Sequence, residues 1–201
     1  MAKATAKKKS APKTPRSVSP AEAAEIFKRL AKSRPDPKTE LDYKDPYTLV
    51  VAVALSAQAT DVGVNKATKE LFRVADTPAK MVALGEEGVA QHIRTIGLWR
   101  NKAKNVVALS RIILEQHNGQ TPRTRAGLEA LPGVGHKTAS VVLNEAYGEA
   151  TIAVDTHVFR VSNRTGLAPE STPEKVEKKL LEVTPEKYKR GAHHWLILHG
   201  R

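Results

Sequence analysis

The chain has 201 residues, enough for one domain or two small ones, and 40% of them are apolar, which suffices for a hydrophobic core. Its 33 Lys and Arg outnumber its 21 Asp and Glu, and the formal net charge of +12 favours a polyanionic partner, either nucleic acid or an anionic membrane surface. No cysteine is present, which excludes disulfides and thiolate-bound metals in these residues. No apolar run reaches the roughly 18 residues that span a bilayer, and no secretory apolar segment is evident, so a cytoplasmic protein is expected.

Residues 1–18 differ in composition from the rest of the chain. They carry six Lys or Arg and no acidic residue, with too few apolar side chains to fold alone. The composition predicts a disordered basic arm. Its role is either a solubilising tail or a non-specific tether to DNA, and composition alone does not decide between the two.

The remaining residues predict an all-α protein. Ser19-Pro20 with Glu22 is typical of a capping box that opens a first helix. The valine-rich run 49–55 could by itself be a buried strand, but no similar partner strand is present, so a helix buried on all sides is expected after Asp45-Pro46. Start signals such as Thr77-Pro78, and stop signals such as Gly85, bound the further helices. These are expected at 62–73, 78–84, 86–95, 100–117, 124–131, 136–147, 156–164, 173–183 and 186–198.

The sequence Leu-Pro-Gly-Val-Gly at 131–135 lies between two of these helices. Gly133, Val134 and Gly135 predict a tight hairpin whose backbone can approach a ligand closely. The unpaired N–H groups and positive dipole end of the following helix make an anion site, and phosphate is the commonest anion found at such sites. A Gly-x-Gly alone is also compatible with an ordinary turn between helices. Lys137 stands in the first turn of the second helix, where a cation is unfavourable, and its presence there therefore needs a reason.

The longer string is more specific. LPGVGHKTASVV, followed by Asp155 in IAVDTHVFRV, resembles the helix-hairpin-helix DNA glycosylases, most closely the endonuclease III family, and the resemblance runs from about residue 19 to residue 201. It implies two helical domains with a substrate cleft between them. One would be a multi-helix barrel at 39–149, and the other would combine 19–38 with 150–201. Lys137 and Asp155 would then lie on opposite sides of the cleft.

The resemblance also implies a chemistry. It indicates a monomeric base excision repair enzyme that removes oxidised pyrimidines from double-stranded DNA and cleaves the abasic site by β-elimination. Lys137 would attack C1′ and form a Schiff base, aided by the helix dipole and by partial burial, both of which favour the neutral amine. Asp155 would deprotonate the lysine or stabilise positive charge on the sugar. The residues alone also allow a phosphate-contacting or surface role for Lys137, and an N-cap role for Asp155.

Further residues match positions at which the family binds DNA. Gln58 in LSAQATD matches the glutamine that fills the gap left by an extruded nucleotide, and Leu98 in IGLWRNKAKN matches the apolar wedge on an opposing loop. A surface or capping glutamine and a packing leucine are the alternatives. Phosphate or DNA contacts are expected for the following residues: Arg100, Lys102, Lys104, His136 and His157. The adjacent His193 and His194 face different ways on a helix and are not expected to hold a metal.

One feature of the family has no counterpart in these residues. Endonuclease III-like proteins carry a four-cysteine loop that holds a 4Fe–4S cluster, and it begins a few residues beyond the position of Arg201. With no cysteine, no cofactor is expected in this chain. A C-terminally truncated sequence is favoured over a cluster-free family member. The alternative functions are a non-catalytic helix-hairpin-helix module that holds DNA by its phosphates, with Lys137 as one contact, and a truncated inactive fragment.

Overall fold

The computed structural model describes residues 16–201, and within that range every regular element is an α-helix, which confirms the all-α prediction there. The basic arm predicted at 1–18 lies outside the described residues except for its last three. Among residues 16–201 no helix is long and apolar enough to cross a membrane. The helices are α1 (Pro20–Ser33), α2 (Pro46–Ser56), α3 (Asp61–Val74), α4 (Pro78–Ile93), α5 (Trp99–Gln116), α6 (Arg125–Glu129), α7 (His136–Tyr147), α8 (Thr156–Thr165), α9 (Pro173–Val183) and α10 (Glu186–Gly200).

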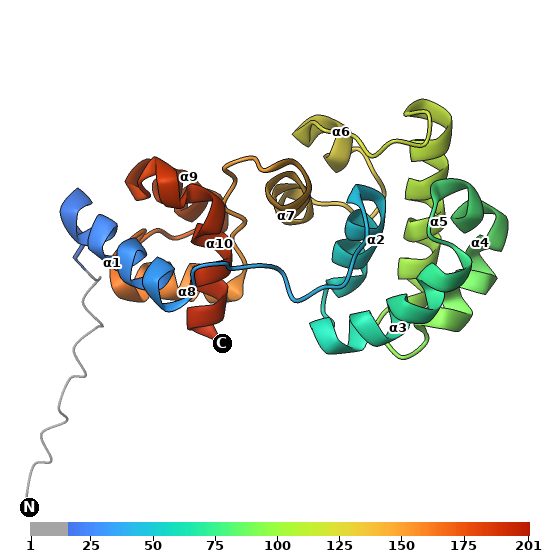
Figure 1. Cartoon of the computed structure of the whole chain (residues 1–201), viewed down its shortest axis with the longest axis horizontal. Coiled ribbons are helices and arrows are strands. Elements are labelled where there is room, and N and C mark those ends of the chain that lie inside the picture. The colour runs from blue at the N-terminus through green and yellow to red at the C-terminus, as the bar shows by residue number, and fades with distance from the viewer. Residues whose placement is uncertain (1–15) are drawn as a thin grey trace, which may run out of the picture.

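The helices form two lobes, each with its own hydrophobic core (Figure 1). The larger core is built by α2 to α7, and the smaller one joins α1 to α8, α9 and α10. Helix α7 stands between the lobes, beside α2 (Figure 1). The chain crosses from the smaller lobe to the larger along 34–45 and returns along 148–155, where Ile152 packs in the smaller core and Ala153 in the larger. The N-terminal helix and the C-terminal helix therefore share a lobe.

Helix α2 forms the centre of the larger lobe, as its uniformly apolar sequence predicts. All residues from Tyr47 to Leu55 are buried, and neighbouring helices α3, α5 and α7 pack around them. The Tyr47 hydroxyl lies 2.7 Å from the Ser110 hydroxyl of α5, so the polar end of this buried ring is satisfied. Asp45 caps the helix by accepting the Thr48 N–H. The buried-helix interpretation is confirmed, and the strand alternative is wrong.

Most helix boundaries follow the predicted start and stop signals. The capping box of Ser19 and Glu22 is present in α1, and Thr77 caps α4. The two short helices expected at 78–84 and 86–95 are one element, α4, with a break at Gly85, where φ of 71° and ψ of 171° are non-helical. Helix α10 begins at Glu186, as predicted, with Pro185 before it and no side-chain cap.

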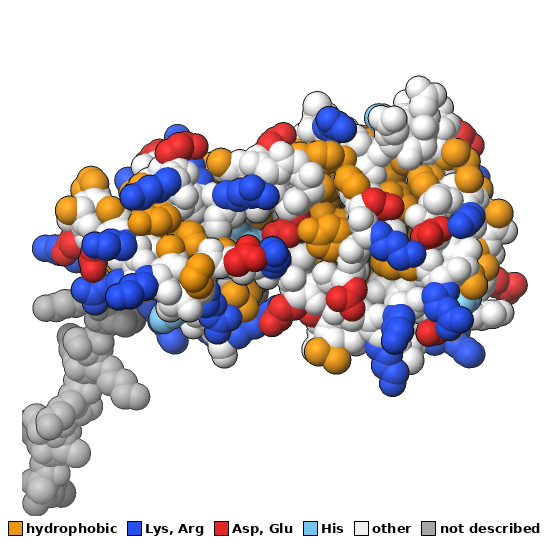
Figure 2. Space-filling view, in the orientation of Figure 1, with side chains coloured by type: hydrophobic (Ala, Val, Ile, Leu, Met, Phe, Trp, Pro, Cys, Tyr) orange, Lys and Arg blue, Asp and Glu red, His pale blue; other side chains and the backbone are white. Residues whose placement is uncertain are grey.

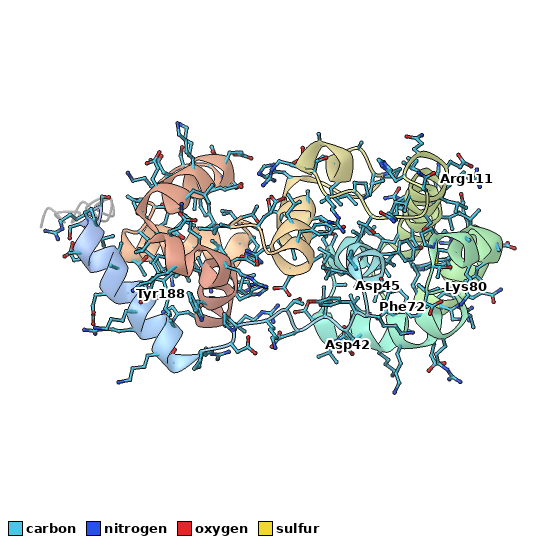
Figure 3. All side chains as sticks on the ribbon, turned by 45° about the horizontal axis from the view of Figure 1, so that its top comes forward. Asp42, Asp45, Phe72, Lys80, Arg111 and Tyr188 are labelled. Atoms are coloured by element: carbon cyan, nitrogen blue, oxygen red, sulfur yellow. The ribbon has the colours of Figure 1, made fainter. Side chains whose placement is uncertain are left out.

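Aromatic side chains hold the two ends of the chain together in the smaller lobe. Tyr188 lies in the smaller lobe (Figure 3). Its ring is between those of Phe27 on α1 and Trp195 on α10, with centroid distances of 6.3 Å and 5.9 Å. The Trp195 indole N–H also donates to the Arg34 carbonyl at 2.8 Å. Because large aromatic side chains dominate the energetics of small cores, this cluster fixes α1 against the C-terminal helix.

Candidate active site

A cleft opens where the two lobes meet, and it contains the two residues to which the sequence assigns the chemistry. Lys137 from α7 and Asp155 from the start of α8 line two adjoining hollows, the larger with a volume of about 780 Å³. Ser56, Asp61 and Arg201 border both hollows as well. The structure therefore brings together side chains from both lobes that are remote in sequence.

The hairpin at 131–135 positions the start of α7, and with it Lys137, at this cleft. Gly133 has φ of 79°, and a Cβ there would come within 3.0 Å of the Asn105 amide nitrogen, so both its conformation and its surroundings favour glycine. Gly135 precedes α7 with no side-chain cap, and a Cβ added to it would meet nothing within 4 Å. The first amides of α7 are thus left for a ligand that can approach closely, as an anion site requires.

Lys137 itself is exposed. The structure does not show the partial burial expected from the sequence, although Lys137 lines both hollows. Its place in the first turn of α7 is as predicted, so it lies at the positive end of the helix dipole. Within residues 16–201 its amine makes no salt bridge of 4.0 Å or less with an acidic side chain, which leaves it available in the cleft.

Asp155 is the N-cap of α8. Its Oδ1 accepts the Val158 N–H at 2.8 Å, which confirms the predicted capping role and fixes the direction of the carboxylate. No group of the described chain bonds Oδ2. The helix dipole stabilises the negative charge at this position. Asp155 therefore presents one oxygen to the protein and keeps the other available in the cleft.

Gln58 and Leu98 share an unusual backbone geometry. Both are exposed, and both have left-handed backbones, with φ of 54° and 59°. Left-handed residues other than glycine are uncommon and cluster at functional sites. The loops that carry them adjoin, since a Cβ added to Gly97 would lie 3.8 Å from the Gln58 carbonyl oxygen. Leu98 leaves 58% of its surface exposed, a large apolar group held out into solvent.

The DNA contact predicted for Lys102 is not what the structure shows. Its side chain is buried on α5, and its Nζ has no hydrogen-bond partner among the described residues. Burial lowers the pKa of Lys102. The helical spacing explains the difference, because Ala103, Val106 and Leu109 place this part of α5 against the core, whereas Lys104 is exposed. The guanidinium of Arg100 lies 4.1 Å from the centre of the Trp99 ring, beside the Leu98 loop.

His136 is engaged within the protein. Its Nδ1 lies 2.9 Å from a Glu129 oxygen, and its Nε2 lies 2.7 Å from a Glu177 oxygen. A guanidinium nitrogen of Arg125 also lies 3.3 Å from Nδ1. The ring therefore joins α6 and α7 to α9 of the other lobe, and the DNA contact of His136 stays a prediction. His157 borders the larger hollow, with Nδ1 3.4 Å from an Arg160 nitrogen.

The distribution of charge is broader than a single basic patch. Lys and Arg side chains are spread over both lobes on the face shown in Figure 2, where they alternate with Asp and Glu. Six of the twelve excess positive charges belong to residues 1–18, so the other half belongs to the rest of the chain. The cleft itself also holds acidic groups. Asp61 lies 2.7 Å from an Arg201 nitrogen, and the same guanidinium contacts Glu40.

Two of the residues bordering the cleft were not predicted from the sequence. Arg201 spans from the smaller lobe to Asp61 and Glu40 of the larger one. His193, which sequence reasoning considered only as a metal ligand, is buried and borders the same hollow as Lys137. Neither residue carries a local motif, so only the packing of the two lobes could reveal them.

The residues present do not fit the iron–sulfur cluster associated with the endonuclease III family. Such clusters are held by thiolates, and the chain has no cysteine. Among residues 16–201, no group of three or more His, Asp or Glu side chains is arranged to hold a metal ion.

Comparison with known proteins gives a consistent result. Residues 51–186 match the family model described as HhH-GPD superfamily base excision DNA repair protein. Endonuclease III of Escherichia coli strain K12 is 60% identical over 181 residues, covering 90% of this chain and 86% of that protein. Endonuclease III of Haemophilus influenzae is 56% identical over 177 residues, covering 88% of this chain and 84% of that protein.

The fold is shared with solved structures. The structure of a trapped endonuclease III–DNA covalent intermediate superposes with a TM-score of 0.85 at 42% identity, over 90% of this chain and 85% of that one. A thermostable thymine-DNA glycosylase has a TM-score of 0.77 at 21% identity, over 90% of this chain and 84% of that one, which shows a common fold.

Proposed function

The chain belongs to the HhH-GPD superfamily of base excision DNA repair proteins, and from this premise we propose that Lys137 and Asp155 carry out its reaction. The activity is that of a DNA glycosylase and AP lyase, and the partner is DNA. The observation that supports the assignment is the shared cleft, in which an unpaired lysine of one lobe and a free carboxylate oxygen of the other meet beside an uncapped helix N-terminus.

The proposed reaction begins with a neutral Lys137 amine. Its nitrogen attacks C1′ of the extruded nucleotide, the bond from C1′ to the base breaks, and the base leaves with the bonding electrons and takes a proton from solvent. Ring opening then gives an imine between Nζ and C1′. Loss of a proton from C2′ permits elimination of the 3′ phosphate, which cleaves the strand. Oδ2 of Asp155 takes the proton that the amine loses, or stabilises positive charge on the sugar.

The remaining residues would hold the DNA. The hairpin at 133–135 and the first amides of α7 would bind a backbone phosphate, while Gln58 and Leu98 fill the space left by the extruded nucleotide. The left-handed backbone and exposure of these two residues support that role. We further propose that oxidised pyrimidines are the substrates, that the enzyme acts as a monomer at cytoplasmic DNA, and that the two cores correspond to domains of 39–149 and of 19–38 with 150–201.

The test is reduction with borohydride, which traps an imine between enzyme and DNA. Lys137→Gln should still bind DNA with an abasic site but should form no trapped adduct, and its strand cleavage should fall to background. Lys175→Gln is the matched control, because Lys175 also lies in the first turn of a helix and is exposed, but does not border the cleft. A Lys137→Gln protein that still traps would falsify the assignment of the nucleophile.

Asp155→Asn tests the role of the carboxylate separately from that of the Lys137 amine. Asparagine keeps the cap but loses the charge, so base excision should fall by a factor on the order of 10²–10⁴, the usual contribution of a positioned acid or base. Cleavage of a preformed abasic site should persist in part, because imine formation depends mainly on the amine. Loss of both activities to the same degree would count against this division of roles.

A further inference from the structure

A buried histidine lies behind the reacting pair. His193 of α10 is 3% exposed, and its Nδ1 lies 2.7 Å from the Ala153 carbonyl oxygen. A carbonyl oxygen has no proton to give, so Nδ1 carries the proton and donates it. Ala153 precedes Asp155 by two residues, on the segment that crosses between the lobes. The imidazole therefore bonds the backbone from which Asp155 projects into the cleft.

The surroundings of His193 favour the neutral imidazole that donates this hydrogen bond. Burial, together with the neighbouring His194, lowers the pKa of His193 to about 3, which favours the neutral ring at neutral pH. The two histidine rings meet edge to face with centroids 4.9 Å apart. His194 in turn bonds Glu145 of α7, at 2.5 Å from Nε2 to Oε1. Helix α10 is thus anchored to the helix that carries Lys137 and, through His193, to the segment that carries Asp155.

We propose that His193 is a positioning residue for base excision, which holds the 153–155 segment through its bond to the Ala153 carbonyl and so fixes Asp155 relative to Lys137. This inference rests on the roles proposed above for Lys137 and Asp155. One wall of the cleft carries Asp155 on a segment without regular structure, where a backbone bond to a rigid helix has the greatest effect. Because catalysis is sensitive to displacements of about 1 Å, loss of this bond should reduce excision markedly.

Two substitutions distinguish the two ring nitrogens. Asparagine places its amide nitrogen where Nδ1 stands and can still donate to Ala153, whereas glutamine reaches the position of Nε2 and loses that bond. His193→Asn should therefore retain excision within about threefold, as a conservative rescue. His193→Gln should lower the single-turnover excision rate by about 10- to 100-fold. His193→Leu removes both nitrogens at similar volume and should behave as His193→Gln does.

The measurement is the ratio of base excision to cleavage of a preformed abasic site, taken on the same protein sample. This ratio is insensitive to the fraction of folded enzyme, so a variant that folds poorly still gives a valid result. It should fall for His193→Gln, because Asp155 serves excision more than it serves imine formation. His199→Gln, an exposed position on the same helix, is the control and should leave the ratio unchanged.

A double-mutant cycle with Asp155→Asn tests whether His193 acts through Asp155. If it does, adding His193→Gln to Asp155→Asn should lower excision no further. The proposal would be overturned by additive losses in the cycle or by an equal fall in both activities. It would also be overturned if His193→Gln were active and His193→Asn inactive, a result that would assign the function to Nε2. These outcomes are independent of trapping by Lys137→Gln, so a failure of the nucleophile assignment can be told apart from a failure of this one.

Discussion

The pair formed by Glu145 and His194 gives a quantitative prediction for stability. Their side chains are only 10% and 7% exposed, and the pair joins α7 to α10 across the two lobes. Burial alone would raise the pKa of Glu145, but the hydrogen bonds from His194 and Tyr43 and the charge of His194 outweigh it, so this pKa lies below its usual value. Glu145 is therefore ionised at neutral pH and engaged by two donors.

Removing one partner of a buried ion pair costs about 3–5 kcal/mol, because the other partner stays buried without compensation. Glu145→Ala should approach that range. Glu145→Gln keeps a hydrogen-bond acceptor for His194, so the loss should be nearer the 1.5–3 kcal/mol of a hydrogen bond to a charged group. For a chain of this size, about 2–4 °C of Tm accompanies each kcal/mol, so Glu145→Gln should melt roughly 3–12 °C lower.

The pH dependence supplies the decisive measurement. A carboxylate whose pKa is lowered on folding stabilises the protein above its unfolded value near 4.5, and that contribution is lost as the pH falls through the folded value. Urea unfolding at pH 7.5 and at pH 4 should therefore show a difference between parent and Glu145→Gln that shrinks in acid. Glu115→Gln, an exposed control, should stay within about 0.5 kcal/mol of the parent. A difference below about 1 kcal/mol at pH 7.5, or one of equal size at both pH values, would refute the reasoning.

Two further predictions concern DNA. Leu98→Ala should leave Tm unchanged, because Leu98 is exposed. It should reduce base excision more than cleavage of a preformed abasic site, because an abasic site has no base left to unstack. An equal loss in both assays would indicate a packing defect. The logarithm of the DNA association constant, measured by fluorescence anisotropy, should fall linearly with the logarithm of salt concentration, because phosphate contacts release counterions. Binding that does not respond to salt would contradict an electrostatic interface.

Local sequence signals account for most of the helical architecture. Proline and threonine starts, the capping box at Ser19 and glycine at Gly85 each act through their own backbone bonds, so they can be recognised without knowing what packs nearby. Helix α10 begins at the predicted residue, Glu186, although Pro185 before it offers no side-chain cap. Propensity alone left α2 ambiguous, and the absence of partner strands resolved it.

Fewer features of the candidate site than of the helices could be predicted from the sequence. The hairpin and Asp155 lie in a recognisable string, and so their contribution to the cleft could be anticipated. Lys102 and Lys104 are both cations on one helix, and only the packing of α5 decides which of them faces solvent. His136 is bonded to Glu177, a partner 41 residues away, and no local pattern predicts that contact.

The pairing of the first helix with the last has a consequence for synthesis of the chain. Helix α1 leaves the ribosome first, but the Trp195 indole that bonds its Arg34 carbonyl follows 161 residues later. At about 5–20 residues per second, the nascent chain carries the apolar face around Phe27 uncovered for roughly ten to thirty seconds. A helix of 14 residues is marginal by itself in water, so it stays largely unfolded during this interval. The larger lobe can fold as soon as its own residues emerge, whereas the smaller lobe forms only after α10 has emerged.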